Sequence, residues 1–296
     1  ETISYSATTA AGEARVTLPD DTGVGVGLRN PVSADFAVMR RTLREAILST
    51  VASNSRTWRG PIAVFEAGSV FLKYGEGLPE ERQMVTGAFA GPRNDLHWDD
   101  SGDTSDFYDA KGALEATLDD LGITAVFEPV EDGTFAPGRT AIVRVPGANN
   151  LAVGIVGEVS DDVFSLFDAE VESVAMFELD LAVCLKVVQG ADNSDGSGKF
   201  TEFVRLPASH RDLSLVVDSG VTVGQIVEIA GRNRIVTSAT VFDVFEGKGV
   251  PEGKKAIAIR LVYQSPNKTL TADQVGKIEQ QTLKQLANEL GAELRV

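Results

Sequence analysis

The side chains that most often carry catalysis are scarce in this chain. Its 296 residues include two histidines, His97 and His210, which are far apart in the sequence. A Ser-His-Asp site around either one stays open, but no nucleophile-elbow sequence supports it, so a structural or surface role is favoured. Cys184, the single cysteine, lies in the apolar run 183–188. One cysteine forms neither an internal disulfide nor a cysteine-based zinc site, so we expect a buried core thiol in a reducing, cytosolic compartment.

Two segments imitate ligand-binding loops. The acidic stretch 97–106 lacks the carboxylate spacing of an EF-hand and its closing glutamate, so a solvated loop is favoured over a calcium site. Gly23–Gly27 has neither the Gly-Lys-Thr/Ser ending of a phosphate loop nor the GxGxxG spacing. With Arg29 behind them, these glycines superficially resemble the third signature of class II aminoacyl-tRNA synthetases, but the next residues fit another motif. We therefore predict no catalytic residue and no metal site.

Charge restricts where a nucleic acid can bind. Residues 200–296 carry 12 Lys+Arg and 11 Asp+Glu, a net of +1, whereas residues 1–199 carry 15 and 32, a net of −17. A strongly acidic body repels nucleic acid at long range, so any RNA contact is expected on the C-terminal third. No stretch approaches the ~18 apolar residues of a membrane span, and no signal peptide opens the chain. The first residue is Glu1 rather than Met, which suggests a piece of a longer protein.

The elements that must position these side chains fall into two domains. Gln189–Gly198 has the composition of a linker, with no apolar residue larger than alanine. Apolar patterning resumes at Phe200. We therefore predict one domain over 1–190, a linker over 191–199 and a second domain over 200–296.

The second domain alternates strands and helices regularly. Strands are predicted at Asp212–Asp218, Ile235–Glu246 and Lys255–Ser265, where apolar residues alternate, and a short one at the C-terminus. Helices are predicted after Thr222 and Thr271, because a Gln three residues later completes a capping box in each case. The order βαββαβ is that of the ferredoxin-like split sandwich, in which both helices cover one sheet face.

The first domain is predicted to be α+β with a mainly antiparallel sheet. Ser33 opens a predicted helix whose apolar residues are four apart, at Met39, Leu43, Ile47 and Val51. The further predicted elements are a strand at Ile62–Glu66, a helix capped by Asp109 and closed by Gly122, a hairpin of Ala141–Val145 and Leu151–Val159, a helix after Ser160 and a strand at Ser173–Leu181.

A set of short motifs follows one another along the chain. They include DFYDAKG at 106–112, Pro137-Gly138-Arg139, FDVFEGKGVPEGKK at 242–255 and Gln264-Ser265-Pro266, with further segments at 30–43, 65–71, 154–158, 177–180, 211–217 and 269–271. Their joint order resembles the C-terminal half of the bacterial phenylalanyl-tRNA synthetase beta subunit, from about residue 25 to the end. The family usually has His where this chain has Ala136.

The resemblance implies a fold and a division of labour. The first domain would have the class II synthetase catalytic-like fold without its chemistry, and the second would be a ferredoxin-like anticodon-binding domain. No convincing Phe-Arg-x-Glu signature, whose Arg and Glu would hold ATP and the amino acid, is present. In this family the alpha subunit carries the active site with ATP and Mg²⁺, so we expect no cofactor in this chain. The implied partners are the alpha subunit and tRNA(Phe), in a cytoplasmic heterotetramer of two alpha and two beta subunits without membrane contact.

The favoured function is therefore a non-catalytic part of phenylalanine–tRNA ligase that supports the alpha subunit and binds the anticodon stem-loop during aminoacylation. The alternative is a ferredoxin-like regulatory protein that binds amino acids, because fold alone does not separate these functions. The helix predicted after Ser33 is the candidate interface with the alpha subunit, or else packs within its own domain. The candidate interface residues are Met39, Arg40, Arg41, Leu43, Arg44 and Ile47.

Candidate RNA-binding residues lie on the sheet face that the helices would leave open. If Ile257, Ile259, Leu261 and Tyr263 face the helices, then Ala258, Arg260, Val262 and Gln264 face outward. On the neighbouring strand the outward set is either Val241, Asp243 and Phe245 or Phe242 and Val244. We favour the first set, which offers an aromatic ring for base stacking, with core packing of Phe245 as the alternative. Arg211, Lys254 and Lys255 could contact phosphates, or else they are solvated surface residues. The full set of candidate RNA-binding residues is Arg211, Phe245, Lys254, Lys255, Arg260 and Gln264.

Overall fold

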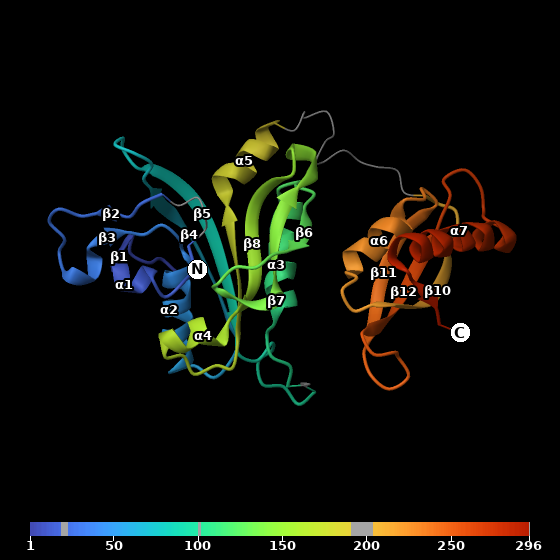
Figure 1. Ribbon diagram of the computed structural model, residues 1–296, viewed down its shortest axis with the longest axis horizontal. Coiled ribbons are helices and arrows are strands. Elements are labelled where there is room, and N and C mark those ends of the chain that lie inside the picture. The colour runs from blue at the N-terminus through green and yellow to red at the C-terminus, as the bar shows by residue number, and fades with distance from the viewer. Residues whose placement is uncertain (19–22, 100–101, 191–203, 296) are drawn as a thin grey trace. The chain divides into compact units, whose positions relative to one another are not determined.

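The computed structural model describes residues 1–18, 23–99, 102–190 and 204–295 (Figure 1). The chain divides into two compact units, unit 1 (Glu1–Ser197) and unit 2 (Gly198–Val296). The linker predicted over 191–199 lies outside the described residues. In the described part of the chain, no helix is both long and apolar enough to cross a membrane.

The centre of unit 1 is a sheet of six strands. They are β4 (Ile62–Leu72), β5 (Glu80–Ala90), β6 (Val126–Pro129), β7 (Phe135–Val145), β8 (Leu151–Val159) and β9 (Val174–Asp180). The spatial order is β4-β5-β9-β8-β7-β6, and all neighbours are antiparallel. This confirms the antiparallel α+β prediction, including the hairpin of β7 and β8. The strands β5 and β6 were not predicted from the sequence.

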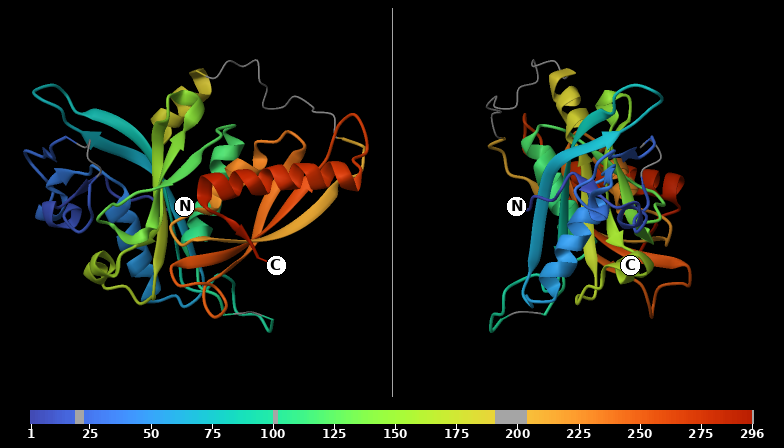
Figure 2. Two further views of the ribbon diagram at one scale, coloured as in Figure 1. Left: turned by 45° about the vertical axis from the view of Figure 1, so that its right-hand side comes forward. Right: turned by 90° about the vertical axis from the view of Figure 1, so that its left-hand side faces the viewer.

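Helices cover both faces of this sheet (Figures 1 and 2). One core cluster joins α2 (Arg44–Ser55), α4 (Asp161–Phe164) and the 3-10 turn Ser165–Phe167 to one face. A second cluster joins α3 (Phe107–Asp120) and α5 (Leu181–Gly190) to the other face. Side chains of β9 alternate between the two clusters, so this central strand is buried on both sides.

Cys184 of α5 is buried in the second cluster, which confirms the predicted core thiol. Burial raises the pKa of the Cys184 thiol to about 11. The thiol therefore stays protonated at neutral pH and is a poor nucleophile, since the thiolate is the reactive form.

The beginning of unit 1 differs from the prediction. Three short strands, β1 (Ala7–Thr8), β2 (Val26–Gly27) and β3 (Val38–Met39), form a small sheet in the order β1-β3-β2, and α1 (Ala10–Glu13) follows β1. Ser33 caps only the 3-10 turn Ala34–Phe36, and α2 begins at Arg44. The predicted helix from Ser33 is therefore wrong, because the backbone of Met39 pairs with two strands instead.

The helix α3 begins earlier than predicted. Asp106, not Asp109, is the N-cap, and its carboxylate accepts a hydrogen bond from the Tyr108 N–H at 2.8 Å. Asp109 completes the capping box by accepting from the Asp106 N–H at 2.8 Å. Gly122 follows the helix with φ +70°, as predicted for a helix stop. Ser160 caps α4 as predicted, and the 3-10 turn Pro146–Ala148 joins β7 to β8.

Unit 2 has the predicted ferredoxin-like order. Its elements are β10 (Ser209–Asp218), α6 (Val223–Gly231), β11 (Val236–Phe245), β12 (Lys254–Tyr263), α7 (Ala272–Leu290) and β13 (Glu293–Leu294). The antiparallel sheet has the order β11-β12-β10-β13. Both predicted capping boxes are present, Thr222 with Gln225 and Thr271 with Gln274. The two helices lie on one face of the sheet, over the buried side chains of β10 and β12 (Figure 1).

Candidate functional site

The described helices of unit 2 leave one face of its sheet uncovered, and strand register determines which side chains lie on it. Ile257, Ile259, Leu261 and Tyr263 are fully buried on the helix side, as predicted. Residues that alternate with them face the other way, and directly opposed residues on antiparallel strands share a face. We call this surface the open face; it includes His210, Asp212, Ser214 and Asp218 of β10, Lys254, Ala258, Arg260 and Val262 of β12, and Ser238, Thr240, Phe242, Asp243 and Phe245 of β11.

Arg260 is the central cation of the open face, and Asp212 holds it in a two-point ion pair. The guanidinium donates from Nε to Asp212 Oδ1 at 2.7 Å and from Nη2 to Asp212 Oδ2 at 2.6 Å. The hydrogen bond from Arg260 lowers the pKa of Asp212 and correspondingly raises the pKa of Arg260. The Arg260 Cζ lies 5.6 Å from the centre of the Phe242 ring. The open face thus combines an aromatic ring with a planar cation.

A β-bulge decides which residues of β11 face outward. The pairs Val241–Ile259 and Asp243–Ala258 skip Phe242. Val241 faces the helices and packs against the core, so the favoured outward set of Val241, Asp243 and Phe245 is wrong in its first member. Phe242 turns outward and is 56% exposed. Phe245 is 43% exposed and pairs with Ala256, so core packing does not account for it.

Two of the predicted cations lie on the helix side rather than the open face. Arg211 is opposite the core residue Leu261, and its Nε lies 3.5 Å from a carboxylate oxygen of Glu279 in α7. Lys255 is opposite the buried Val217, and its Nζ donates to the Ser219 carbonyl at 2.8 Å. Because each side chain reaches a partner on its own side of the sheet, neither shares a surface with Arg260.

The two remaining candidates have partners within unit 2. Lys254 is opposite Asp218, and its Nζ donates to Glu293 Oε1 at 3.1 Å. Gln264 donates from Nε2 to the Leu206 carbonyl at 2.7 Å, so it anchors the segment before β10. Of the predicted set, Arg260, Lys254 and Phe245 therefore keep the orientation that a ligand on the sheet would require. Sequence reasoning did not single out Asp212, and it placed Phe242 in the set that was not favoured.

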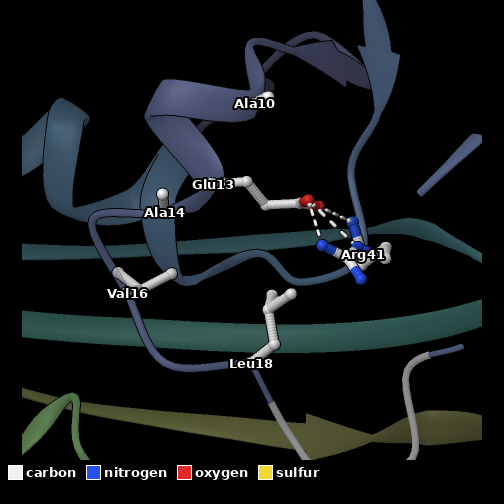
Figure 3. Close-up of a pocket in the computed structure, with 6 residues that line it drawn as sticks. All are labelled: Ala10, Glu13, Ala14, Val16, Leu18 and Arg41. Carbon is white, nitrogen blue, oxygen red and sulfur yellow. Dashed lines mark hydrogen bonds and ion pairs between the residues drawn. The ribbon is translucent and has the colours of Figure 1, made fainter. Parts of the chain in front are cut away.

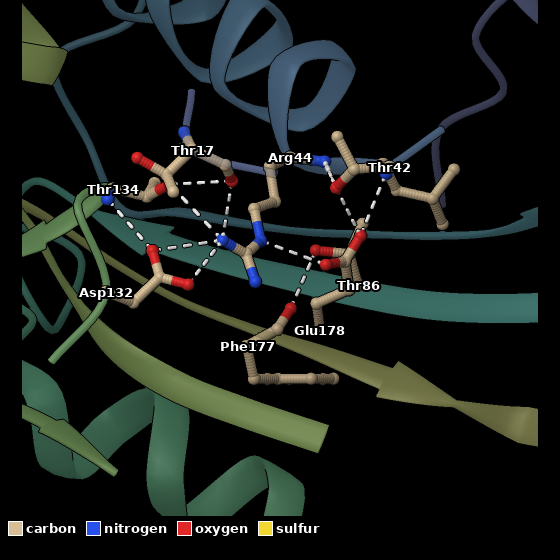
Figure 4. A network of polar contacts seen from close by, with 9 residues as sticks. Thr17, Thr42, Arg44, Thr86, Asp132, Thr134, Phe177 and Glu178 are labelled. Atoms are coloured by element: carbon tan, nitrogen blue, oxygen red, sulfur yellow. Dashed lines mark hydrogen bonds and ion pairs between the residues drawn. The ribbon is translucent and has the colours of Figure 1, made fainter. Parts of the chain in front are cut away.

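In unit 1, the candidate interface residue Arg44 belongs to a buried polar network (Figure 4). Its Nε donates to Glu178 Oε2 at 2.9 Å, and its Nη1 donates to Asp132 Oδ2 at 2.9 Å. Thr42 also donates to Glu178, at 2.6 Å. Burial by itself lowers the pKa of Arg44, but Glu178 and Asp132 outweigh it and raise that pKa. Arg44 therefore fastens the start of α2 to β9 and does not face a partner.

Arg40 and Arg41 are also held by carboxylates of their own unit. Arg40, 5% exposed, donates from Nη1 to Glu66 Oε1 at 2.6 Å. Arg41 donates from Nη2 to the buried Glu13 at 2.7 Å (Figure 3). This pair lines a cavity of ≈ 360 Å³ whose other walls are Ala10, Ala14, Val16 and Leu18. The walls are mostly aliphatic, and the polar atoms satisfy each other, so the cavity offers no reactive group.

The predicted interface is therefore corrected. Leu43 and Ile47 are fully buried in the cores of unit 1, and Met39 lies in the small sheet. Because Arg40 and Arg44 are buried too, these two arginines with Leu43 and Ile47 lie inside unit 1 rather than on an outer surface. Met39 and Arg41 are partly exposed. The apolar residues spaced four apart, which suggested an interface, pack against the sheet of unit 1 instead; they include Leu43, Ile47 and Val51.

Three sequence motifs of unit 1 meet at the start of α3. Asp109 of DFYDAKG accepts from Arg93 Nε at 3.0 Å. The Phe107 N–H of the same motif donates to Glu158 Oε1 at 3.3 Å, and Arg139 of the Pro-Gly-Arg turn also pairs with Glu158. The motifs therefore form a clamp of hydrogen bonds and ion pairs that joins α3, β7, β8 and the loop after β5. Among the described residues, no group of three or more His, Cys, Asp or Glu side chains could hold a metal ion.

Comparison with known proteins finds a family match for each of the two units. The family described as "Phenylalanyl tRNA synthetase beta chain CLM domain" matches residues 1–181. The family described as "Ferredoxin-fold anticodon binding domain" matches residues 204–295. The two matches are consecutive along the chain and correspond to the two compact units.

Similar proteins cover the whole chain. It is 32% identical over 303 residues to the phenylalanine–tRNA ligase beta subunit of Clostridium acetobutylicum, across 100% of this chain and 36% of that protein. It is 36% identical over 276 residues to the same subunit of Chromobacterium violaceum, across 92% of this chain and 33% of that protein. The chain thus spans about a third of the length of these relatives. A solved pyrrolysyl-tRNA synthetase of Desulfitobacterium hafniense aligns with a TM-score of 0.46 at 17% identity, over 64% of this chain and 62% of that one.

Proposed function

The chain belongs to the phenylalanyl-tRNA synthetase beta-chain family, and on that premise we propose that it is a non-catalytic part of phenylalanine–tRNA ligase. Unit 2 binds the anticodon stem-loop of tRNA(Phe), and unit 1 supports the alpha subunit, in a cytoplasmic assembly of two alpha and two beta subunits. The observation that carries the RNA-binding part is the open face, where Phe242 lies exposed beside Arg260.

The open face suits unpaired bases. Single-stranded loops present unstacked bases, and proteins bind such bases by stacking them on aromatic rings and guanidinium planes. The small side chains of Ser214 and Ala258 flank Arg260 along the sheet, so a base can approach the backbone closely. Phe245 extends the aromatic surface toward the end of β11. This argument favours RNA over the alternative, a free amino acid, which would need a pocket rather than a flat sheet.

A binding experiment tests this function. Phe242→Ala in the full chain should weaken binding of the tRNA(Phe) anticodon stem-loop by about 1–3 kcal/mol, the usual contribution of one stacked base. Val244→Ala is the matched control, because Val244 is 50% exposed, against 56% for Phe242, but pairs with Ile257 on the helix side. Phe245→Ala measures the contribution of Phe245, the aromatic residue predicted from the sequence, to the same binding. A chain that binds a scrambled hairpin as well as the stem-loop at low salt would contradict anticodon binding.

The chain by itself is proposed to make no aminoacyl-adenylate, with ATP and Mg²⁺ bound by the alpha subunit. ATP phosphates are gripped best by the free fork of an arginine. In unit 1, three arginines are already paired with carboxylates: Arg40 with Glu66, Arg41 with Glu13 and Arg44 with Glu178. These residues therefore do not fit ATP. Pyrophosphate exchange with phenylalanine and ATP should stay at background, and exchange that vanishes with Arg29→Ala would revive a catalytic role for the glycine loop.

The contact with the alpha subunit is proposed on the surface around the small sheet instead of on α2. Ile3, Tyr5, Val24 and Val32 are large apolar residues there with at least 61% of their surface exposed. Tyr5 also packs edge-on against Phe36, at 4.9 Å between ring centres. Exposed apolar clusters often mark protein interfaces. Tyr5→Asp with Val32→Asp should reduce co-purification with the alpha subunit, whereas Leu78→Asp, on the turn between β4 and β5, should not.

A further inference from the structure

The open face contains cations but leaves them little freedom to bind a phosphate. The Nε and Nη2 donors of Arg260, the fork that would grip a phosphodiester, already bind both oxygens of Asp212. Lys254, which the register puts on the same face, donates to Glu293. A phosphate arriving here must therefore either displace a carboxylate or bind the remaining Nη1 donors of Arg260 close to the negative charge of Asp212, which repels it.

The carboxylates also outnumber the cations on this side of the sheet. Asp212 is opposite Arg260, Asp218 is opposite Lys254, and Asp243 is opposite Ala258. A phosphodiester carries a negative charge and is repelled by such a surface, whereas a base is neutral and loses nothing by stacking. Phe242, beside Arg260 and 56% exposed, offers the stacking surface.

We propose that Asp212 is a specificity-determining residue, which keeps the RNA backbone off the open face by holding the fork of Arg260 and so leaves that face to unpaired bases. This inference rests on the proposed RNA-binding function of unit 2. Asp212 acts through Arg260 and need not touch the RNA. Its role is to make paired RNA, which exposes phosphates but no unstacked base, a poor ligand.

Asp212→Asn in the full chain tests the inference. Two probes are titrated across salt concentrations, the anticodon stem-loop of tRNA(Phe) and a blunt RNA duplex with the same number of phosphates. The variant should bind the duplex about three- to tenfold more tightly, because the freed guanidinium gains a charge-assisted contact with a phosphate. Its log–log salt slope for the duplex should steepen by about 0.7–0.9, the increment for one added phosphate contact. Binding of the stem-loop should change less, so that the preference for it falls.

Two further variants separate the ion pair from plain charge removal. Asp218→Asn removes the same charge from the same strand and side, but Asp218 lies opposite Lys254 whereas Arg260 pairs with Asp212, so this variant should change duplex binding by less than twofold. In Asp212→Asn combined with Arg260→Gln, the gain should disappear, because it depends on the arginine.

The outcomes distinguish the inference from the function beneath it. A wild-type chain that does not prefer the stem-loop contradicts the proposed function and this inference with it. A wild-type chain that does prefer the stem-loop, with Asp212→Asn no tighter on duplex than Asp218→Asn, overturns the inference alone. A gain that survives the loss of Arg260 also overturns it.

Discussion

At the scale of single residues, Arg44 shows how much a buried ion pair depends on both partners. Arg44 and Glu178 each keep only 2% of their side-chain surface exposed. Arg44→Met leaves the Glu178 and Asp132 carboxylates without their cation, which should cost about 3–5 kcal/mol in the free energy of unfolding. Arg260→Met, at an exposed pair that solvent screens, should cost far less. Urea denaturation measures both, and equal losses would contradict the network's role.

Tyr263 is a second residue whose polar atom decides its effect. The ring is fully buried, and its hydroxyl has no hydrogen-bond partner among the described residues. Because the buried hydroxyl makes no hydrogen bond in the folded state, Tyr263→Phe removes no stabilising contact. The variant should therefore be as stable as the wild type or more stable by about 1 kcal/mol. If the variant is instead less stable by more than about 1 kcal/mol, the hydroxyl of the wild type must bind a partner such as an ordered water.

The same tyrosine predicts a difference at alkaline pH. Burial, with a smaller contribution from Glu279, raises the pKa of Tyr263 to about 12. Between its ordinary value and about 12, the unfolded state loses the tyrosine proton while the folded state keeps it, so stability falls as the pH rises. Tyr263→Phe should lack this part of the alkaline loss. Urea unfolding at pH 9 and pH 11 measures the difference between wild type and variant.

At the scale of elements, the start of α3 is held by a clamp that titrates. Burial tends to raise the pKa of Asp109, but hydrogen bonds from Arg93 and from the Asp106 N–H outweigh it and lower that pKa. Its stabilising contribution is therefore present above the ordinary aspartate pKa and is lost as the pH falls through the lowered value.

Replacing this carboxylate should weaken α3. Asp109→Asn should cost about 1 kcal/mol at pH 7, because the capping box and the ion pair with Arg93 are both impaired. The difference between wild type and variant should begin to shrink as the pH falls below the ordinary aspartate pKa, and it should disappear once the pH has fallen through the lowered pKa of Asp109 in the folded protein. Asp119→Asn, at the other end of the same helix, is the control. A difference that persists at acid pH would contradict the electrostatic part of the argument.

At the scale of the whole molecule, charge limits how RNA is bound. Residues 200–296 have a net charge of +1 and residues 1–199 one of −17, so long-range attraction is weak. Stem-loop binding should therefore use few phosphates, about 2–4, with a log–log salt slope of about −1.5 to −3. A slope steeper than about −5 would require a basic surface that the charge distribution does not favour.

The sequence alone determined most of unit 2. Thr222 with Gln225 and Thr271 with Gln274 are local signals, since a capping box satisfies backbone groups within a few residues of itself. The alternation of Ile257, Ile259 and Leu261 likewise depends only on strand geometry. Both patterns depend only on residues that are close together in the sequence, so they could be predicted without the tertiary structure.

Only the tertiary structure decided which candidate side chains face outward. Asp243 and Phe245 face outward together with Phe242 because a bulge inserts one residue into β11, and a shift of one residue reverses the sides of the strand beyond it. Arg44 is buried because its partner Glu178 lies 134 positions away in the sequence. Polar residues enter a core when a distant charge compensates them, and no local pattern records that distance. The sequence therefore identified the fold and the family, while the long-range pairings determined which surface is available for the proposed RNA binding.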